Sequence, residues 1–279
     1  MKAQPLKDQY VKVGSINTRY WTEGNKGKTI ILLHCAGGSV EFWLYNISLL
    51  AQYHRVYAVD MVGSGLSDKP SASYSLLYQA HFIQSFMDTL DIKSATLIGH
   101  SMGGGVALQF AITFPQQVEK LVLVDSFGLG RRIALSVRLT SLPFVISSLR
   151  PSKSLLTSIL RQNCYDSTLI PQEWIELRYP VFSLASRNKS LVKLARTNLN
   201  LFGVRSSAFR HIIKNLAMIT APSLIIWGKQ DPVLPISHAY IAAQGLPNNC
   251  LHIFDLCGHN PQLEYPQKFN RLALEFIAS

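Results

Sequence analysis

The sequence predicts an α/β protein whose mostly parallel sheet is covered by helices on both faces. Short apolar runs typical of buried strands alternate with segments in which apolar residues recur at helical spacing. The strand-like runs are continuously apolar, as expected for strands buried on both faces. The chain has 279 residues, of which 48% are hydrophobic, and this suits one large core with an insertion.

The elements follow in chain order. Two runs on either side of a glycine turn predict a β-hairpin, Tyr10–Val13 and Thr18–Thr22. Further strands are expected at Thr29–Leu33, Arg55–Val59, Ala95–Ile98, Lys120–Val124, Ser223–Trp227 and Leu251–Phe254. Helices are expected at Glu41–Ala51, Tyr78–Leu90, Val106 to about Phe114, Ile236–Gln244 and Gln267–Ile277.

One segment breaks this alternation. From Gly128 to about Arg210 there is helical spacing with several prolines and no clear strand. Between Gly128 and Lys214 there are 14 Lys and Arg but only 3 Asp and Glu, so this stretch carries the whole net charge of +11. We therefore predict a core of residues 1–127 and 211–279 and an inserted helical cap, 128–210. The cap is expected over the carboxyl ends of the strands, where open α/β sheets bind ligands.

The organising stretch is Thr96–Leu108, in which a predicted strand meets a predicted helix at Gly99-His100-Ser101-Met102-Gly103. Serine between two glycines at such a joint is typical of a nucleophile elbow. The glycines let strand and helix approach closely, and the helix N-terminus stabilises negative charge near Ser101. Ser101 is therefore the predicted nucleophile.

A serine nucleophile needs a base and a group that orients the base. His259 and Asp231 each follow a predicted strand after the insertion, so both should lie at the same sheet edge as Ser101. We predict His259 as the base and Asp231 as the orienting acid. Asp125, which follows the Lys120–Val124 strand, is the alternative acid because it could reach the histidine from the other side.

The oxyanion formed during acyl transfer needs two N–H donors. One is predicted at Met102, directly after the nucleophile, and the other at Ala36, with Gly37 close behind it. Additional pocket residues are predicted by their place in these loops or beside them: His34, Trp43, His100 and Asn260. For Trp43 a place in the core is an equal alternative, and for His34 the expected role is to support the loop.

Several other classes of function are disfavoured. The loop around Gly63 and Gly65 lacks the spacing of phosphate-binding loops, and no nucleic-acid recognition motif accompanies the basic charge. The four cysteines have no metal-ligand spacing, so we expect free thiols and no metal. Since the sequence shows neither a signal peptide nor a membrane span, we expect a cytoplasmic location.

Five motifs in order, LLHCAGGS, DMVGSGLSDKP, GHSMGG, PSLIIWGKQDPVLP and GHNPQLEYP, resemble the α/β-hydrolase superfamily. The resemblance covers nearly all of the chain except the insertion. It implies an eight-stranded, mostly parallel sheet with a helical cap and no cofactor. Cys35 is a departure, because the superfamily usually has glycine after the histidine, and its side chain is expected to narrow the oxyanion loop.

The residues favour a serine hydrolase that cleaves carboxylic esters through an acyl-enzyme. The segment from GHSMGG to FGLGRR is also similar to hydrolases that cleave the C–C bond of 2-hydroxy-6-oxo-dienoates. Those usually carry asparagine before the serine and tryptophan after the histidine, whereas this chain has His100 and Asn260. The alternatives are therefore a C–C hydrolase or a non-catalytic small-molecule-binding member of the fold.

The expected partner is a small ester. The basic cap points to an anionic or lipid-like substrate or to peripheral contact with an anionic membrane, while a solvated basic surface is the alternative. The sequence leaves the oligomeric state open.

Overall fold

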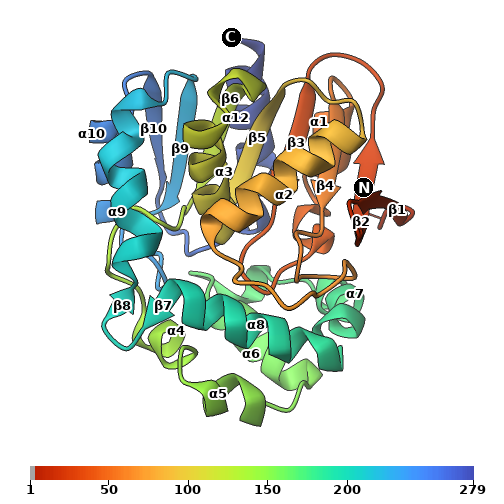
Figure 1. The fold of residues 1–279 in the computed structure, drawn as a ribbon, viewed down its shortest axis with the longest axis vertical. Helices are drawn as coiled ribbons and strands as arrows, with labels where there is room; N and C mark the ends of the chain where they lie inside the picture. Colours follow the sequence, from red (N-terminus) through yellow and green to blue (C-terminus); the bar gives the residue numbers. More distant parts are fainter. Residues whose placement is uncertain (1–3) are drawn as a thin grey trace.

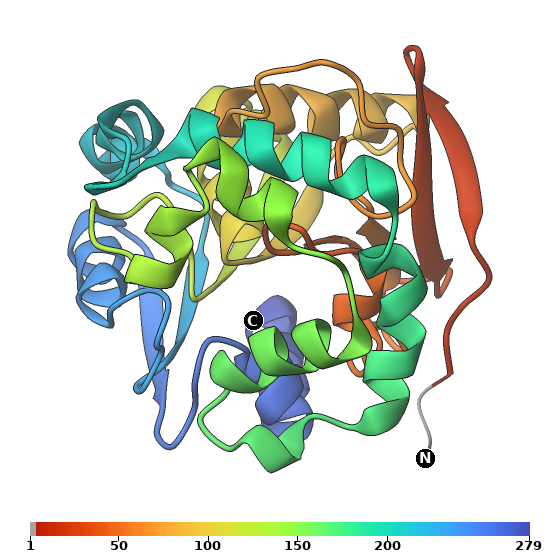
Figure 2. The same ribbon diagram turned by 90° about the horizontal axis from the view of Figure 1, so that it is seen from below.

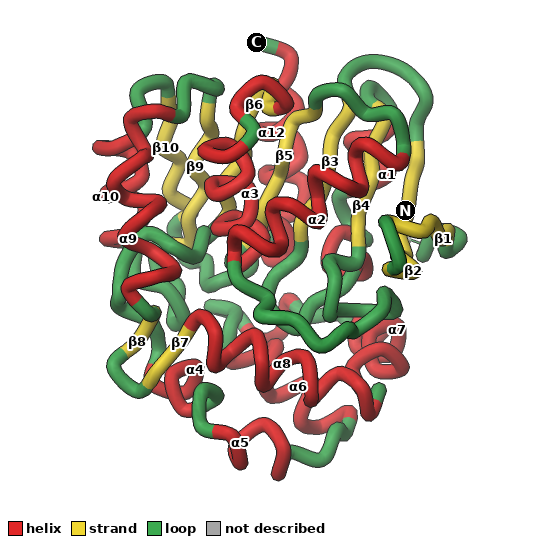
Figure 3. The backbone as a smooth tube through the Cα atoms, viewed as in Figure 1, coloured by secondary structure: helices red, strands yellow, loops and turns green. Residues whose placement is uncertain are grey.

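The computed structural model describes residues 4–279, so the first three residues of the predicted core lie outside it. Its centre is one eight-stranded sheet in the order β1-β2-β4-β3-β5-β6-β9-β10 (Figure 3). The pairs β1–β2 and β2–β4 are antiparallel and all other neighbours are parallel, which confirms the predicted fold class. The strands are β1 (Gln9–Val13), β2 (Ile16–Glu23), β3 (Thr29–Leu33), β4 (Arg55–Val59), β5 (Ala95–His100), β6 (Val118–Val124), β9 (Ser223–Gly228) and β10 (Asn249–Phe254).

Helices cover both faces of the sheet (Figure 1). One face carries α2 (Leu76–Thr89), α3 (Met102–Thr113) and α10 (Ser237–Gly245), and the other carries α1 (Ile47–Ala51) and α12 (Pro266–Ala278). Alternate residues of β3 serve the two faces: Ile31 and Leu33 pack in the first cluster, Ile30 and Leu32 in the second. Each of these buried side chains contributes about 1.5–3 kcal/mol, so both layers hold the central strand in place.

The predicted helix at Glu41–Ala51 is wrong as a single element. The chain forms a 3-10 helix, η1 (Val40–Trp43), and then the short helix α1. The break lies at the buried Asn46, whose amide donates hydrogen bonds to the Gln262 carbonyl at 3.1 Å and to Asn270 Oδ1 at 3.0 Å. These bonds connect the break to the C-terminal segment, a long-range contact that helical periodicity does not report.

The inserted segment lies across the end of the sheet where the parallel strands finish (Figures 1 and 2). Its helices are α4 (Leu135–Leu139), α5 (Pro143–Ser148), α6 (Lys153–Gln162), α7 (Gln172–Phe182) and α8 (Ala185–Asn198). The expectation of no strand there is wrong, because β7 (Leu199–Asn200) and β8 (Gly203–Val204) pair antiparallel. With two residues each, these strands are too short to show a periodic pattern.

The chain returns to the core through α9 (Ser206–Asn215), which packs against α3 and α10. The predicted cap boundary at residue 210 falls inside this helix. Among residues 4–279, no helix combines the length and apolar character that crossing a membrane requires.

Hydrogen bonds connect the cap to the core. The Trp174 indole N–H donates to the Glu41 carbonyl at 2.8 Å, and the Asn198 amide donates to the Tyr74 carbonyl at 3.1 Å. The His259 N–H donates to the Asn163 carbonyl at 2.7 Å. The cap is therefore tied directly to the loop that carries the predicted catalytic base.

Candidate active site

Ser101 lies in a tight turn between β5 and α3. Its φ of 54° is in the left-handed region, which side chains other than glycine rarely adopt. A Cβ atom on Gly99 would lie 2.4 Å from the Gly103 carbonyl oxygen, and one on Gly103 would lie 2.2 Å from the Leu33 carbonyl oxygen. Only glycine fits at both positions, so the two glycines allow the strained turn that presents Ser101 at the start of α3.

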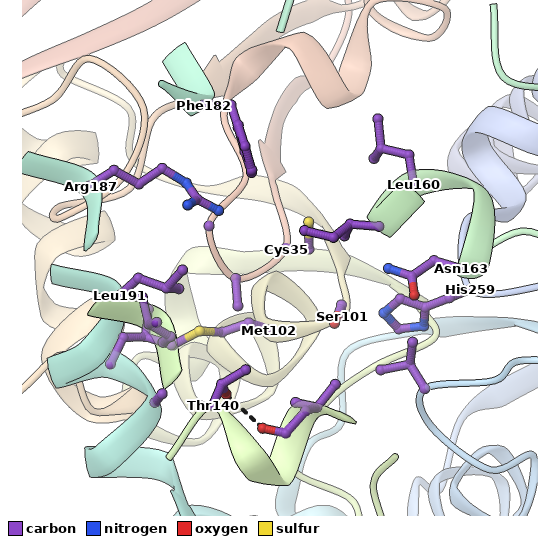
Figure 4. A pocket seen from close by; sticks show the side chains of 18 of the residues that line it. Cys35, Ser101, Met102, Thr140, Leu160, Asn163, Phe182, Arg187, Leu191 and His259 are labelled. Atoms are coloured by element: carbon purple, nitrogen blue, oxygen red, sulfur yellow. Dashed lines mark hydrogen bonds between the residues drawn. The ribbon is translucent and has the colours of Figure 1, made fainter. Parts of the chain in front are cut away.

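His259 and Asp231 meet at the carboxyl ends of β10 and β9. The distance between His259 Nδ1 and Asp231 Oδ2 is 2.8 Å. The other carboxylate oxygen of Asp231 accepts the N–H groups of Val233 at 2.7 Å and Leu234 at 3.0 Å. Because Nδ1 faces the carboxylate, Nε2 of His259 is the nitrogen available to a serine hydroxyl. In Figure 4, His259 and Ser101 lie close together beside one cavity, which both line.

The loop that carries His259 is organised by Glu264, in the short helix α11 (Pro261–Glu264). This buried carboxylate accepts the N–H groups of Gly258 and Asn260, and also that of Tyr165 in the cap at 2.8 Å. Glu264 was not among the predicted site residues, although it lies in the GHNPQLEYP motif. Its spacing from His259 is the signal that could have identified it.

Asp125 is the second carboxyl group behind His259. It is fully buried, with a φ of 43°, and its Oδ1 accepts the Gly228 N–H at 3.0 Å. A carboxylate oxygen of Asp125, a carboxylate oxygen of Asp231 and a ring nitrogen of His259 all lie within 4.8 Å of one another. Burial and the neighbouring Asp231 carboxylate raise the pKa of Asp125 well above its ordinary value. A carboxyl group with a raised pKa favours its protonated form, so we expect Asp125 to be neutral and Asp231 to be the acid that orients His259 through the 2.8 Å hydrogen bond.

The two predicted oxyanion donors border the same cavity. Met102 is the first residue of α3, where N–H groups have no partner within the helix, and Ala36 lies in the loop after β3. Gly37 and Cys35 also line the cavity. The loop is closed by a hydrogen bond from the Gly38 N–H to the Cys35 carbonyl at 3.0 Å.

His34 is not a pocket residue. Its Nδ1 lies 2.7 Å from the Cys35 carbonyl oxygen, and its Nε2 accepts the Met61 N–H at 3.1 Å. Burial lowers the pKa of His34 to about 4, so the ring is neutral at physiological pH. As expected, His34 supports the loop, but the prediction that it lines the pocket is wrong because the ring is fully buried between two loops.

Two further pocket predictions are corrected and one agrees with the structure. Trp43 is fully buried against Phe269, with ring centroids 6.4 Å apart, and belongs to the core. His100 is fully buried, and its Nε2 lies 2.6 Å from the His259 carbonyl oxygen, so the ring serves the histidine loop instead of the cavity. Asn260 lines the cavity, although its amide is directed to the sulfur of Cys164 at 3.6 Å.

The cavity between core and cap has a volume of about 270 Å³. Ser101, His259 and Met102 border it on the core side, while Leu160 and Leu191 border it on the cap side (Figure 4). Most of its lining side chains are aliphatic or aromatic. Such a cavity favours a largely apolar ligand held next to the serine.

Two cap arginines interrupt this apolar lining. The Arg178 guanidinium stacks on Phe42 at 3.9 Å, and that of Arg187 stacks on Phe182 at 4.3 Å. Burial lowers the pKa of both groups, that of Arg187 to about 10. Neither makes a salt bridge within residues 4–279, and the Nε atom of each is buried without a hydrogen-bond partner. These two residues were missed as site residues, because the sequence shows the charge of the cap but not which cations turn inward.

Comparison with known proteins agrees with this architecture. A family model described as the alpha/beta hydrolase fold matches residues 28–266. An uncharacterised protein of Mycobacterium tuberculosis is 32% identical over 90% of this chain and 75% of its own length. A 2-hydroxy-6-oxo-6-phenylhexa-2,4-dienoate hydrolase of Burkholderia cepacia is 30% identical over 92% of this chain and 90% of its own. The crystal structure of a putative lipase from Acinetobacter baumannii has a TM-score of 0.84 at 26% identity, covering 98% of this chain and 91% of that one.

Proposed function

This chain belongs to the alpha/beta hydrolase family, and we propose that it hydrolyses carboxylic esters by a serine mechanism. The observation that carries the proposal is the hydrogen bond between His259 and Asp231 at a cavity that Ser101 also lines. A nucleophile, a base and a group that orients the base are the elements that acyl transfer requires.

The proposed reaction has two steps. Ser101 attacks the ester carbonyl while His259 takes its proton, and the N–H groups of Met102 and Ala36 stabilise the oxyanion. The bond to the alcohol then breaks and His259 protonates the leaving oxygen. In the second step His259 activates a water molecule, which releases the carboxylic acid and restores Ser101. Asp231 stabilises the imidazolium in both steps.

We further propose that the substrate carries an anionic group, such as a carboxylate, on an otherwise apolar body. Arg178 is buried and Arg187 is half-buried in the cavity wall, neither makes a salt bridge with the described residues, and a buried charge without such a partner is costly. A ligand carboxylate would supply that partner. The apolar lining suits the remainder of the molecule.

C–C bond cleavage of a 2-hydroxy-6-oxo-dienoate is the second candidate. The relative from Burkholderia cepacia carries that substrate in its name, and such a substrate has both a carboxylate and an apolar body. Against this candidate, His100 is bound to the His259 carbonyl and turned from the cavity, so it offers no contact to a substrate.

A substrate series tests both candidates. We expect the p-nitrophenyl ester of a dicarboxylic acid, with one free carboxylate, to be hydrolysed with a higher kcat/KM than the matched neutral ester. Arg187→Met should remove this preference by raising KM for the anionic ester while hydrolysis of the neutral ester remains. Cleavage of the dienoate but of neither ester would replace the ester proposal with the second candidate.

A further inference from the structure

Residues 131–162, here called the roof segment, run over the cavity and contain α4, α5 and α6. This stretch has six Arg or Lys residues and no Asp or Glu. Its inward side lines the cavity with side chains that include Val137, Ile146 and Leu156. The lining accounts for only part of its apolar character.

Large apolar side chains also point outward from the roof segment. Their exposed fractions are 65% for Leu135, 39% for Leu139, 63% for Phe144, 40% for Leu149 and 36% for Ile159. Strands β7 and β8 contact α4, and the turn between them adds Leu201 at 49% and Phe202 at 75%. Exposed apolar residues that gather on one unit typically mark a surface that contacts another apolar phase.

Basic side chains are interspersed with these residues. Arg131, Arg132, Arg150 and Arg161 are exposed, and none of them makes a salt bridge in the part of the chain that the structure describes. Lys153 differs, since it pairs with Glu176. The surface therefore combines unpaired positive charge with exposed leucine and phenylalanine.

The position of the roof segment favours docking. The cap forms the end of the molecule away from the sheet, with α5 farthest from it, and α4, α5 and α6 face the viewer when the molecule is seen from below (Figures 1 and 2). Leu149 and Ile159 are both exposed and part of the cavity lining, so the rim of the cavity lies on this same surface.

We propose that the roof segment, together with the turn between β7 and β8, docks on an anionic membrane surface. Phe144, Phe202 and Leu135 would enter the boundary between headgroups and acyl chains, and the arginines would contact lipid phosphates. Amphipathic helices with basic and large apolar residues bind membranes in this way. Binding of nucleic acid would use the charge but not the exposed leucines. Docking in this orientation presents the cavity rim to the bilayer, and it does not depend on which bond the enzyme cleaves.

Sedimentation with vesicles tests the proposal. We expect the protein to sediment with vesicles of phosphatidylcholine and phosphatidylglycerol but not with phosphatidylcholine alone. Replacing Arg132, Arg150 and Arg161 by glutamine should weaken binding about 100-fold, since each basic residue near such a surface contributes about 5-fold. The matched control variant replaces three lysines that are exposed on the core, Lys12, Lys26 and Lys93, by glutamine in the same way. This variant should bind vesicles as the wild type does.

A second variant tests the apolar contact. Phe144→Ser with Phe202→Ser should weaken binding about 10-fold or more, because burial of each ring would be lost. Membrane docking would be overturned in favour of plain electrostatic attraction if the serine variant bound vesicles as the wild type does and the protein also bound any other polyanion, such as DNA. Absence of wild-type binding would overturn it outright. Ser101→Ala should bind vesicles normally, so a failed esterase assay and a failed docking assay remain distinguishable.

Discussion

Replacing Asp125 by asparagine should leave catalysis nearly intact. The raised pKa of Asp125 favours its protonated form, and an asparagine amide copies that form: its oxygen accepts the Gly228 N–H, now 3.0 Å from Oδ1, and its NH₂ faces Asp231. We expect kcat/KM to stay within about 3-fold of the wild type. The corresponding change in activation free energy is smaller than the roughly 1 kcal/mol that one neutral hydrogen bond contributes. Asp231→Asn should instead lower kcat by about 10⁴-fold, because an amide there favours the wrong tautomer of His259.

The assay is hydrolysis of a p-nitrophenyl ester by the two variants across pH 5 to 9. The reasoning would be refuted if Asp125→Asn lost as much activity as Asp231→Asn, since Asp125 would then be the ionised partner of His259. Asp125→Ala serves as the structural control. It leaves the Gly228 N–H without its acceptor and should lower the free energy of unfolding by about 1–3 kcal/mol.

Other expected effects concern stability, and urea denaturation measures each of them. Arg19→Met should lower the free energy of unfolding by about 3–5 kcal/mol, because it leaves the buried carboxylates of Glu41 and Asp60 unpaired; a loss below 1 kcal/mol would contradict this. Burial lowers the pKa of His34 from 6.5 to about 4, so the unfolded chain binds more protons between these values. The contribution of His34 to the free energy of unfolding is complete above about pH 6.5, and it falls by up to about 3 kcal/mol as the pH drops towards 4. His34→Gln should flatten this dependence, and an unchanged slope would argue against a neutral buried ring. Gly103→Ala would place a Cβ 2.2 Å from the Leu33 carbonyl oxygen and should lower the free energy of unfolding by about 1–3 kcal/mol. Wild-type stability of this variant would contradict the close approach of the two backbones at Gly103.

The strands could be predicted because their signal is local. β4 matches its predicted bounds, and continuous apolar runs are what a sheet covered on both faces requires. Ser101, Asp231 and His259 were predicted from a motif and from their places after strands, and the structure brings Asp231 and His259 together beside the cavity that Ser101 and His259 line. His100 was misplaced because its ring direction depends on a hydrogen bond to residue 259, far along the chain. The inward turn of Arg178 likewise depends on how the cap packs against Phe42, which no local pattern encodes.

Labelling with a fluorophosphonate tests the central claim most directly, namely that Ser101 is a nucleophile activated by His259. Wild-type protein should gain one covalent adduct, which peptide mass spectrometry should place on Ser101. The variants Ser101→Ala and His259→Ala should remain unlabelled while keeping the circular dichroism spectrum of the wild type. Equal labelling of wild type and Ser101→Ala, or an adduct on another residue, would contradict the account.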